Sequence, residues 1–373
     1  MKTNRLYFID TIRAFAILMM LQGHFIDGLL NASYKSETYL AFNIWNYFRG
    51  NTAPIFFTIS GLIVMLLFLK AHGTEKENYR IQKGLKRGGT LILLGYALRI
   101  PYFQWLGGQF NTYFLVTDVL QIIGLSLLLL NGSFYLFKSK LKILPYFFLG
   151  IGTLIFLTEP LYRTLELPKI PLAIANYFSK ANGSVFTIFP WFGYICYGAF
   201  IAHLFHKYQF KERFKTTAIS VLTITGLFLM FISSPLLSAI SQVTHIDLLE
   251  AVSTFNYLYV RLGNVLLTFA LFYALETQLK HPLISKIGRN TLSIYVVHFI
   301  ILYGSFTGIG LYKFYHNGLL PVQAVFGALL FIIAVTVIVL NEDKIKASFV
   351  TLTKKALVGL RLNLLKQILL NRR

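Results

Sequence analysis

The chain has 373 residues, of which 56% are hydrophobic and only 13% are charged. This composition lies outside the range of soluble globular domains and inside that of proteins solvated by lipid. A formal net charge of +21 would also suit a nucleic-acid-binding protein. Here, however, the basic residues form short clusters between apolar segments, as in the cytoplasmic loops of membrane proteins. We therefore predict an all-α, polytopic membrane protein with no nucleic-acid partner.

The cysteine content and the N-terminal segment do not indicate the cellular compartment of the protein. Cys196 is the single cysteine and lies in an apolar segment, so we expect neither a disulfide within the chain nor a cysteine-based metal site. No other metal site is predicted. The first apolar segment begins close to Met1 and lacks a small-residue cleavage signal, so we expect its helix to be retained.

Apolar segments of the length needed for one helical crossing, roughly 20 residues, predict about ten membrane-spanning helices. The expected spans are residues 10–30, 52–70, 88–106, 113–131, 141–158, 184–206, 216–237, 252–276, 289–305 and 319–340.

Lysine and arginine predict how these spans are oriented. The basic clusters follow the second, fourth, sixth and eighth spans, as exemplified by Lys83, Lys138, Lys211 and Lys286, whereas the intervening loops carry few basic residues. Cytoplasmic loops are the basic ones. We therefore predict a transmembrane domain over residues 1–340 in the inner (plasma) membrane, with both chain ends in the cytoplasm.

Two segments lie outside this pattern. Residues 341–373 combine basic residues with apolar residues at helical spacing, which predicts an amphipathic cytoplasmic tail bound to anionic membrane lipids. The longest outer connection, residues 159–183, is rich in proline and glycine and is either a lid or a linker.

The first span carries four ionisable side chains. At about 100° per residue, Asp10, Arg13, His24 and Asp27 share one side of the helix, with His24 about 16 Å beyond Arg13 towards the outer end. Ionisable groups are costly in hydrocarbon, so this side should face protein or a water-filled cavity. A histidine aligned with two carboxylates indicates proton transfer, and a structural histidine is the alternative.

Other polar residues are candidates at a similar depth. Arg99 ends the third span and Asp118, with Gln121, begins the fourth; the arginine and the aspartate form either a structural pair or a substrate or cofactor site. His298 in the ninth span is either structural or pore-lining. Residues 83–89, which include Arg87, are expected to open the third helix, where amides and cations suit a phosphate-bearing cofactor or simply form a basic loop.

Several motifs resemble transmembrane acyltransferases. Arg5-Leu-Tyr-Phe-Ile-Asp-Thr-Ile-Arg, followed by His24, resembles their opening helix, and Pro54-Ile-Phe-Phe-Thr-Ile-Ser-Gly resembles their Phe-Phe-x-x-Ser-Gly motif. Asp118-Val-Leu-Gln-Ile-Ile-Gly is similar to the Val-Leu-Gln-x-x-Gly element of the heparan-alpha-glucosaminide N-acetyltransferase branch. Gly288-Arg-Asn-Thr-Leu-Ser-Ile-Tyr-Val-Val-His resembles a late helix of related bacterial acyltransferases.

The sequence departs from that branch at two places. At the position aligned with His24 the branch carries asparagine, and its catalytic histidine lies farther along the chain. A histidine at this position is instead typical of bacterial acyltransferase family three. The Arg-x-x-Arg pair expected in the third span is absent, which leaves Arg99.

The resemblance implies an enzyme that uses acetyl-CoA from the cytoplasm and acylates a hydroxyl or amine of an extracytoplasmic sugar or glycan. In this hypothesis His24 accepts the proton of the attacking group, or is itself acylated, and Asp27 or Asp10 orients its ring. The remaining assignments are Arg13, Arg87 and Arg99 for the cofactor, and Asp118, Gln121, Ser60 and His298 for the substrate or its developing oxyanion.

Two other classes of function remain open at this stage. Intramembrane aspartate, arginine and histidine also build proton-coupled transporters, although the two halves of the chain show no similarity. A scaffold whose polar pairs only join helices is the third alternative. A homodimer is compatible with the sequence.

Overall fold

The structure is a computed structural model that describes residues 6–342. Within this range the chain forms helices and no strand, apart from one isolated bridge between Leu30 and Leu319. The all-α class predicted from the sequence is confirmed. The predicted basic tail lies, except for Asn341 and Glu342, outside the described residues.

Each predicted span corresponds to a helix, although several boundaries move by more than a turn. The main helices are α1 (Tyr7–Leu29), α3 (Thr52–Ala71), α4 (Glu77–Arg99), α6 (Val119–Phe137), α7 (Leu144–Leu157), α10 (Ile188–Tyr208), α11 (Phe214–Phe231), α14 (Tyr257–Ala274), α16 (Thr291–Tyr303) and α18 (Pro321–Leu340). The shorter ones used below are α2 (Leu40–Arg49), α8 (Glu159–Tyr162), α9 (Leu172–Ala175), α12 (Ser233–Thr244), α13 (Asp247–Thr254), α15 (Pro282–Arg289) and α17 (Leu311–Tyr315).

By length and composition, seven helices within residues 6–342 are able to cross a membrane, or eight if α15 and α16, bent by 68° at their junction, form one span. Two of the predicted crossings are atypical. Helix α7 has only 14 residues, and the first half of α4 is rich in charged residues. The polytopic membrane class is therefore confirmed, whereas the number ten and the orientation remain predictions.

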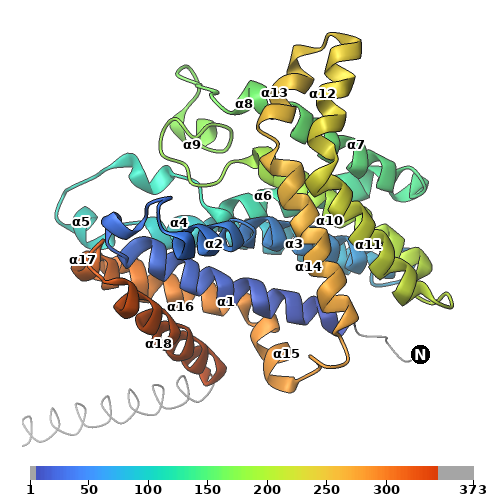
Figure 1. Cartoon of the computed structure of the whole chain (residues 1–373). Coiled ribbons are helices and arrows are strands. Elements are labelled where there is room, and N and C mark those ends of the chain that lie inside the picture. The colour runs from blue at the N-terminus through green and yellow to red at the C-terminus, as the bar shows by residue number, and fades with distance from the viewer. Residues whose placement is uncertain (1–5, 343–373) are drawn as a thin grey trace, which may run out of the picture.

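Several of the main helices pack in pairs (Figure 1). Helix α3 packs against α10, α4 against α6, and α11 against α14, while α1 contacts α3, α15 and α18. Helices α12 and α13 form a hairpin that projects beyond the rest at the top of Figure 1. Because α1 contacts helices from the beginning and the end of the chain, its polar side is enclosed by both.

Glycines bring α3 and α10 into backbone contact. A Cβ atom on Gly61 would lie 2.1 Å from the carbonyl oxygen of Ile195, and one on Gly198 would lie 1.9 Å from that of Thr58. Small residues at such crossings let helix backbones approach closely in membranes. This contact holds α3 in place, and the neighbouring side of α3, with Phe56 and Ser60, lines the cavity described below.

The structure corrects the prediction for residues 83–89. Helix α4 begins at Glu77, so this segment lies inside the helix and its amides do not form a helix N-terminus. Gly84 and Gly88 instead let α4 approach α6, since a Cβ on Gly88 would lie 2.9 Å from the carbonyl oxygen of Gly124. Only the basic side chains of the segment remain available to an anion.

Residues 159–183, which contain α8 and α9, are attached to the segment that leads into α6. The Thr117 hydroxyl donates to the carbonyl oxygen of Asn176 at 2.6 Å, and the Asn176 amide donates to that of Leu115 at 2.9 Å. Asn176 is fully buried. Whether the segment acts as a lid or a linker stays a prediction.

The contact between α3 and α10 generates a test of the packing. We expect Gly61→Ala to destabilise the protein by at least about 1–3 kcal/mol, because the new methyl group overlaps a carbonyl oxygen of α10. Thermal unfolding in detergent measures the change. Gly132→Ala in α6 is the matched control, since no heavy atom lies within 4 Å of its Cβ position, and equal melting temperatures for the two variants would contradict the prediction.

Candidate functional site

A cavity of about 520 Å³ extends between α1, α3, α4 and α6. At one end, which we call the basic end, it is lined by Arg80, Lys83 and Arg87 from the first half of α4. At the other, the His24 end, it is lined by His24, Arg49, Asp118 and Arg261. The wall between them is mostly apolar and includes Ile17, Met20, Phe56, Ile63, Leu91 and Ile123.

Helix α1 contributes a side chain to both halves of this cavity. Arg13 and His24, which the helical spacing places on one side of α1, both line it. The Arg13 guanidinium donates to the Thr291 hydroxyl of α16 at 3.0 Å. Arg13 thus lies nearer the basic end and His24 about 16 Å farther along the helix axis.

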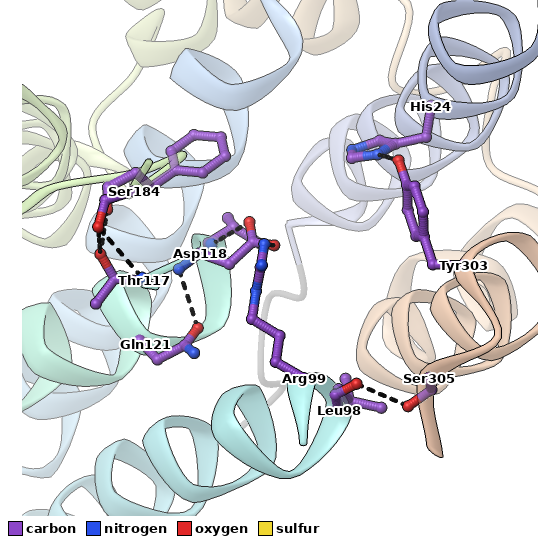
Figure 2. A network of polar contacts seen from close by, with 11 residues as sticks. His24, Leu98, Arg99, Thr117, Asp118, Gln121, Ser184, Tyr303 and Ser305 are labelled. Atoms are coloured by element: carbon purple, nitrogen blue, oxygen red, sulfur yellow. Dashed lines mark hydrogen bonds and ion pairs between the residues drawn. The ribbon is translucent and has the colours of Figure 1, made fainter. Parts of the chain in front are cut away.

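The His24 ring is held by a residue from the other end of the chain. Its Nδ1 atom lies 2.8 Å from the hydroxyl of Tyr303, the last residue of α16 (Figure 2). If Nδ1–H donates to the Tyr303 oxygen, Nε2 carries a lone pair. Within residues 6–342 no side chain or backbone group hydrogen-bonds to Nε2, so that lone pair is available to a molecule in the cavity.

The structure does not bring either predicted carboxylate to His24. Asp27 accepts a hydrogen bond from Arg49 at 2.6 Å, and both side chains are partly exposed, by 48% and 35% respectively. Asp10 lies about 21 Å from His24 along the helix axis, in a small pocket with Lys70 beside the basic end. The group that orients the imidazole is therefore Tyr303 and not an aspartate.

Arg99 and Asp118 form a buried ion pair, with 2.6 Å between Nη2 and Oδ2 and side-chain exposures of 10% and 12% (Figure 2). Asp118 also caps α6, because its Oδ1 accepts the Val119 amide at 2.7 Å and the Gln121 side chain accepts the Asp118 amide at 3.2 Å. This arrangement is a capping box. The pair joins the end of α4 to the start of α6, so its geometry favours the structural interpretation.

The other predicted substrate residues occupy less accessible places. The Ser60 hydroxyl faces the cavity but donates to the Phe56 carbonyl oxygen at 2.7 Å. Gln121 and His298 are fully buried. The Nδ1–H of His298 donates to the Tyr295 carbonyl oxygen, and its ring centroid lies 5.3 Å from that of His24. His298 thus backs the His24 ring while Tyr295 lines the cavity.

Sequence reasoning missed three residues at the site: Tyr303, Arg49 and Thr291. A tyrosine at the end of an apolar span gives no signal by itself. Arg49 did give one, because it is an isolated cation in a loop otherwise poor in basic residues. Thr291 and Tyr303 lie on a helix whose pairing with α1 depends on the tertiary fold.

Together, the helices and the cavity define a polytopic membrane protein with a polar internal site reached from a basic end. Residues 5–235 match the family described as heparan-alpha-glucosaminide N-acetyltransferase, catalytic. The match covers more than half of the chain, which therefore belongs to this family of membrane acetyltransferases. No curated protein sequence matches the chain.

Family membership confirms the branch recognised from the Asp118–Gly124 element. It favours the enzyme over the transporter and the scaffold. The likeness to bacterial acyltransferase family three stays a prediction. Within the part of the chain that the structure describes, no group of three histidine, cysteine, aspartate or glutamate side chains could hold a metal ion.

The buried Arg99–Asp118 pair generates a stability prediction. We expect Asp118→Asn to destabilise the protein by about 3–5 kcal/mol, because it leaves the Arg99 charge buried without its partner while asparagine still caps the helix. Asp27→Asn, at a partly exposed pair, should cost less than about 1 kcal/mol. Thermal unfolding of both variants in detergent measures the difference, and equal losses would show that Asp118 has no special structural role.

Proposed function

We propose that this protein transfers the acetyl group of acetyl-CoA, bound from the cytoplasm at the basic end, to a hydroxyl or amine of an extracytoplasmic sugar or glycan at the His24 end. The observation that carries the proposal is a single cavity lined both by the basic side chains of α4 and by His24. Family membership supplies the class of reaction. The positive-inside rule supplies the direction, since it assigns the basic end to the cytoplasm.

The residues along the cavity suit the parts of acetyl-CoA. Arg80, Lys83 and Arg87 offer charge-assisted hydrogen bonds to its phosphates. The apolar wall suits the long arm that carries the thioester, and Arg13 adds a cation along that wall. Arg99, the third predicted cofactor residue, forms an ion pair with Asp118, so its charge is not available to the phosphates of the donor.

The site provides a base for the attacking group. With Nδ1–H donating to Tyr303, the Nε2 atom of His24 accepts the proton of the acceptor hydroxyl or amine. The acceptor oxygen or nitrogen bonds to the thioester carbonyl carbon, the carbon–sulfur bond breaks, and the thiolate of CoA takes the proton from the imidazolium. Because Ser60 already donates its proton to Phe56, it is poorly placed to stabilise the oxyanion.

We expect His24→Gln to lower acetyl transfer by about 10²–10⁴-fold, the usual contribution of a general base. Tyr303→Phe should lower kcat by about 10-fold with little change in KM for acetyl-CoA, because the ring loses the hydrogen bond that selects its tautomer. Transfer of labelled acetyl groups in membranes containing each variant measures both effects.

Tyr312→Phe is the matched control for Tyr303, since its ring packs against Tyr303 at 5.6 Å between centroids and its hydroxyl forms no hydrogen bond within residues 6–342. CoA should still raise the melting temperature of His24→Gln, Tyr303→Phe and Tyr312→Phe, which would show that all three variants fold and bind the donor. Undiminished transfer by well-folded His24→Gln would refute the role of His24. Labelled acetyl retained on His24 without acceptor would instead indicate an acyl-histidine intermediate.

The basic end generates a second prediction. We expect Arg80→Gln and Arg87→Gln each to raise KM for acetyl-CoA by about 5- to 10-fold, the loss of one charge-assisted hydrogen bond, with kcat nearly unchanged. Lys140→Gln, at an exposed lysine just after α6, is the control and should change neither constant. If all three variants behave alike, the phosphates bind elsewhere.

A further inference from the structure

Tyr295, on α16, is a buried tyrosine that the reaction described above does not use. It lines the cavity and is only 6% exposed. Within residues 6–342 its hydroxyl forms no hydrogen bond, and it is not one of the unpartnered polar atoms that are inaccessible to solvent. The hydroxyl is therefore open to the cavity. Because a buried hydroxyl without a hydrogen bond is costly, a partner inside the cavity is expected.

Two contacts between α1 and α16 place Tyr295 along the cavity. Arg13 donates to Thr291, and the His24 ring contacts Tyr303. The two helices therefore run in the same direction. Tyr295 lies about 6 Å beyond Thr291 and about 12 Å before Tyr303 along the axis of α16. A donor that enters at the basic end thus passes Tyr295 before it reaches His24.

Neighbouring rings fix the position of the phenol relative to the imidazole. The ring centroid of His298 lies 4.9 Å from that of Tyr295 and 5.3 Å from that of His24. On the other side, the centroid of Phe299 lies 6.1 Å from that of Tyr295. One ring thus separates the phenol from the imidazole. This spacing suits an attacking atom and a carbonyl group placed in line, with a hydrogen bond of about 2.6–3.2 Å at each end.

We propose that the Tyr295 hydroxyl binds the carbonyl oxygen of the donor thioester and stabilises the oxyanion that develops on it. When the acceptor atom bonds to the carbonyl carbon, an electron pair of the carbon–oxygen double bond moves to the oxygen. Tyr295 donates a hydrogen bond to that oxygen and keeps its proton. The double bond then re-forms as the carbon–sulfur bond breaks. Such a donor, held in place in a water-poor cavity, binds the charged transition state more strongly than the neutral thioester.

The role is one that Ser60 leaves open, because the Ser60 hydroxyl donates to the Phe56 carbonyl oxygen. The proposal rests on the proposed function, since it assumes that the donor extends from the basic end towards His24. Tyr295 lies outside residues 5–235, the part that matches the family. The site would therefore take its base from α1 and its oxyanion donor from α16.

We expect Tyr295→Phe to lower kcat for acetyl transfer by about 10²–10³-fold, the usual cost of removing one oxyanion donor, with a smaller change in KM for acetyl-CoA. Tyr273→Phe is the matched control. Tyr273 is 5% exposed, its hydroxyl forms no hydrogen bond within the described residues, and it lies away from the cavity, so both constants should stay unchanged. Equal kcat values for Tyr295→Phe and the unchanged protein would overturn the proposal.

Infrared difference spectroscopy tests the hydrogen bond without turnover. Acetyl-CoA labelled with ¹³C at its carbonyl carbon is bound, without acceptor, to the full-length protein in nanodiscs. We expect the thioester carbonyl band of the bound donor to lie at lower frequency in the unchanged protein and in Tyr273→Phe than in Tyr295→Phe, because a hydrogen bond weakens the carbonyl double bond. A rise in melting temperature with CoA shows that each variant folds and binds the donor.

The spectra separate failure of this proposal from failure of the proposed function. The same band position in Tyr295→Phe and the unchanged protein would refute the role of Tyr295 and leave the donor site intact. No bound thioester band in the unchanged protein would refute the donor site and the role of Tyr295 together. Should Tyr295→Phe not fold, the unchanged protein is compared with labelled S-ethyl thioacetate in dry hexane, and a band no lower than in hexane would overturn the proposal.

Discussion

The cost of placing ionisable side chains in a lipid-solvated domain constrains the whole structure. Each such residue of the described bundle has to contact an opposite charge, a polar group of another helix, or the internal cavity. Arg99 and Asp118 contact each other as opposite charges. Arg13 contacts a polar group of another helix, the Thr291 hydroxyl. His24 contacts the Tyr303 hydroxyl and also lines the cavity. The cavity lies where these polar residues converge. The cost of exposing ionisable side chains to lipid therefore constrains both the helix packing and the location of the site.

The cavity differs in chemistry from one end to the other, and this difference supports a direction for the reaction. Within the described residues, Arg80, Lys83 and Arg87 at the basic end form no ion pair with a carboxylate, which suits the phosphates of the proposed donor, and the apolar wall suits its thioester arm. At the His24 end, the imidazole lies near two paired arginines, Arg49 with Asp27 and Arg99 with Asp118. In the proposed reaction, the donor and the acceptor therefore reach the same imidazole from opposite ends of the cavity.

The contact between His24 and Tyr303 joins the first main helix to one near the end of the chain. The family match ends at residue 235, yet Tyr303, His298, Thr291 and Arg261 all lie beyond it. The C-terminal helices thus complete a site whose histidine, His24, comes from the N-terminal part.

The sequence by itself determined the all-helical membrane class, the approximate position of the ten main helices, the family, and the shared side of Arg13 and His24, because hydrophobic length, motif spacing and helical periodicity are local properties. Only the tertiary structure decided which groups meet. It paired Asp27 with Arg49, joined Arg99 to Asp118, and brought Tyr303 to the imidazole. Those outcomes depend on contacts between helices far apart in the chain, which periodicity within one helix does not encode.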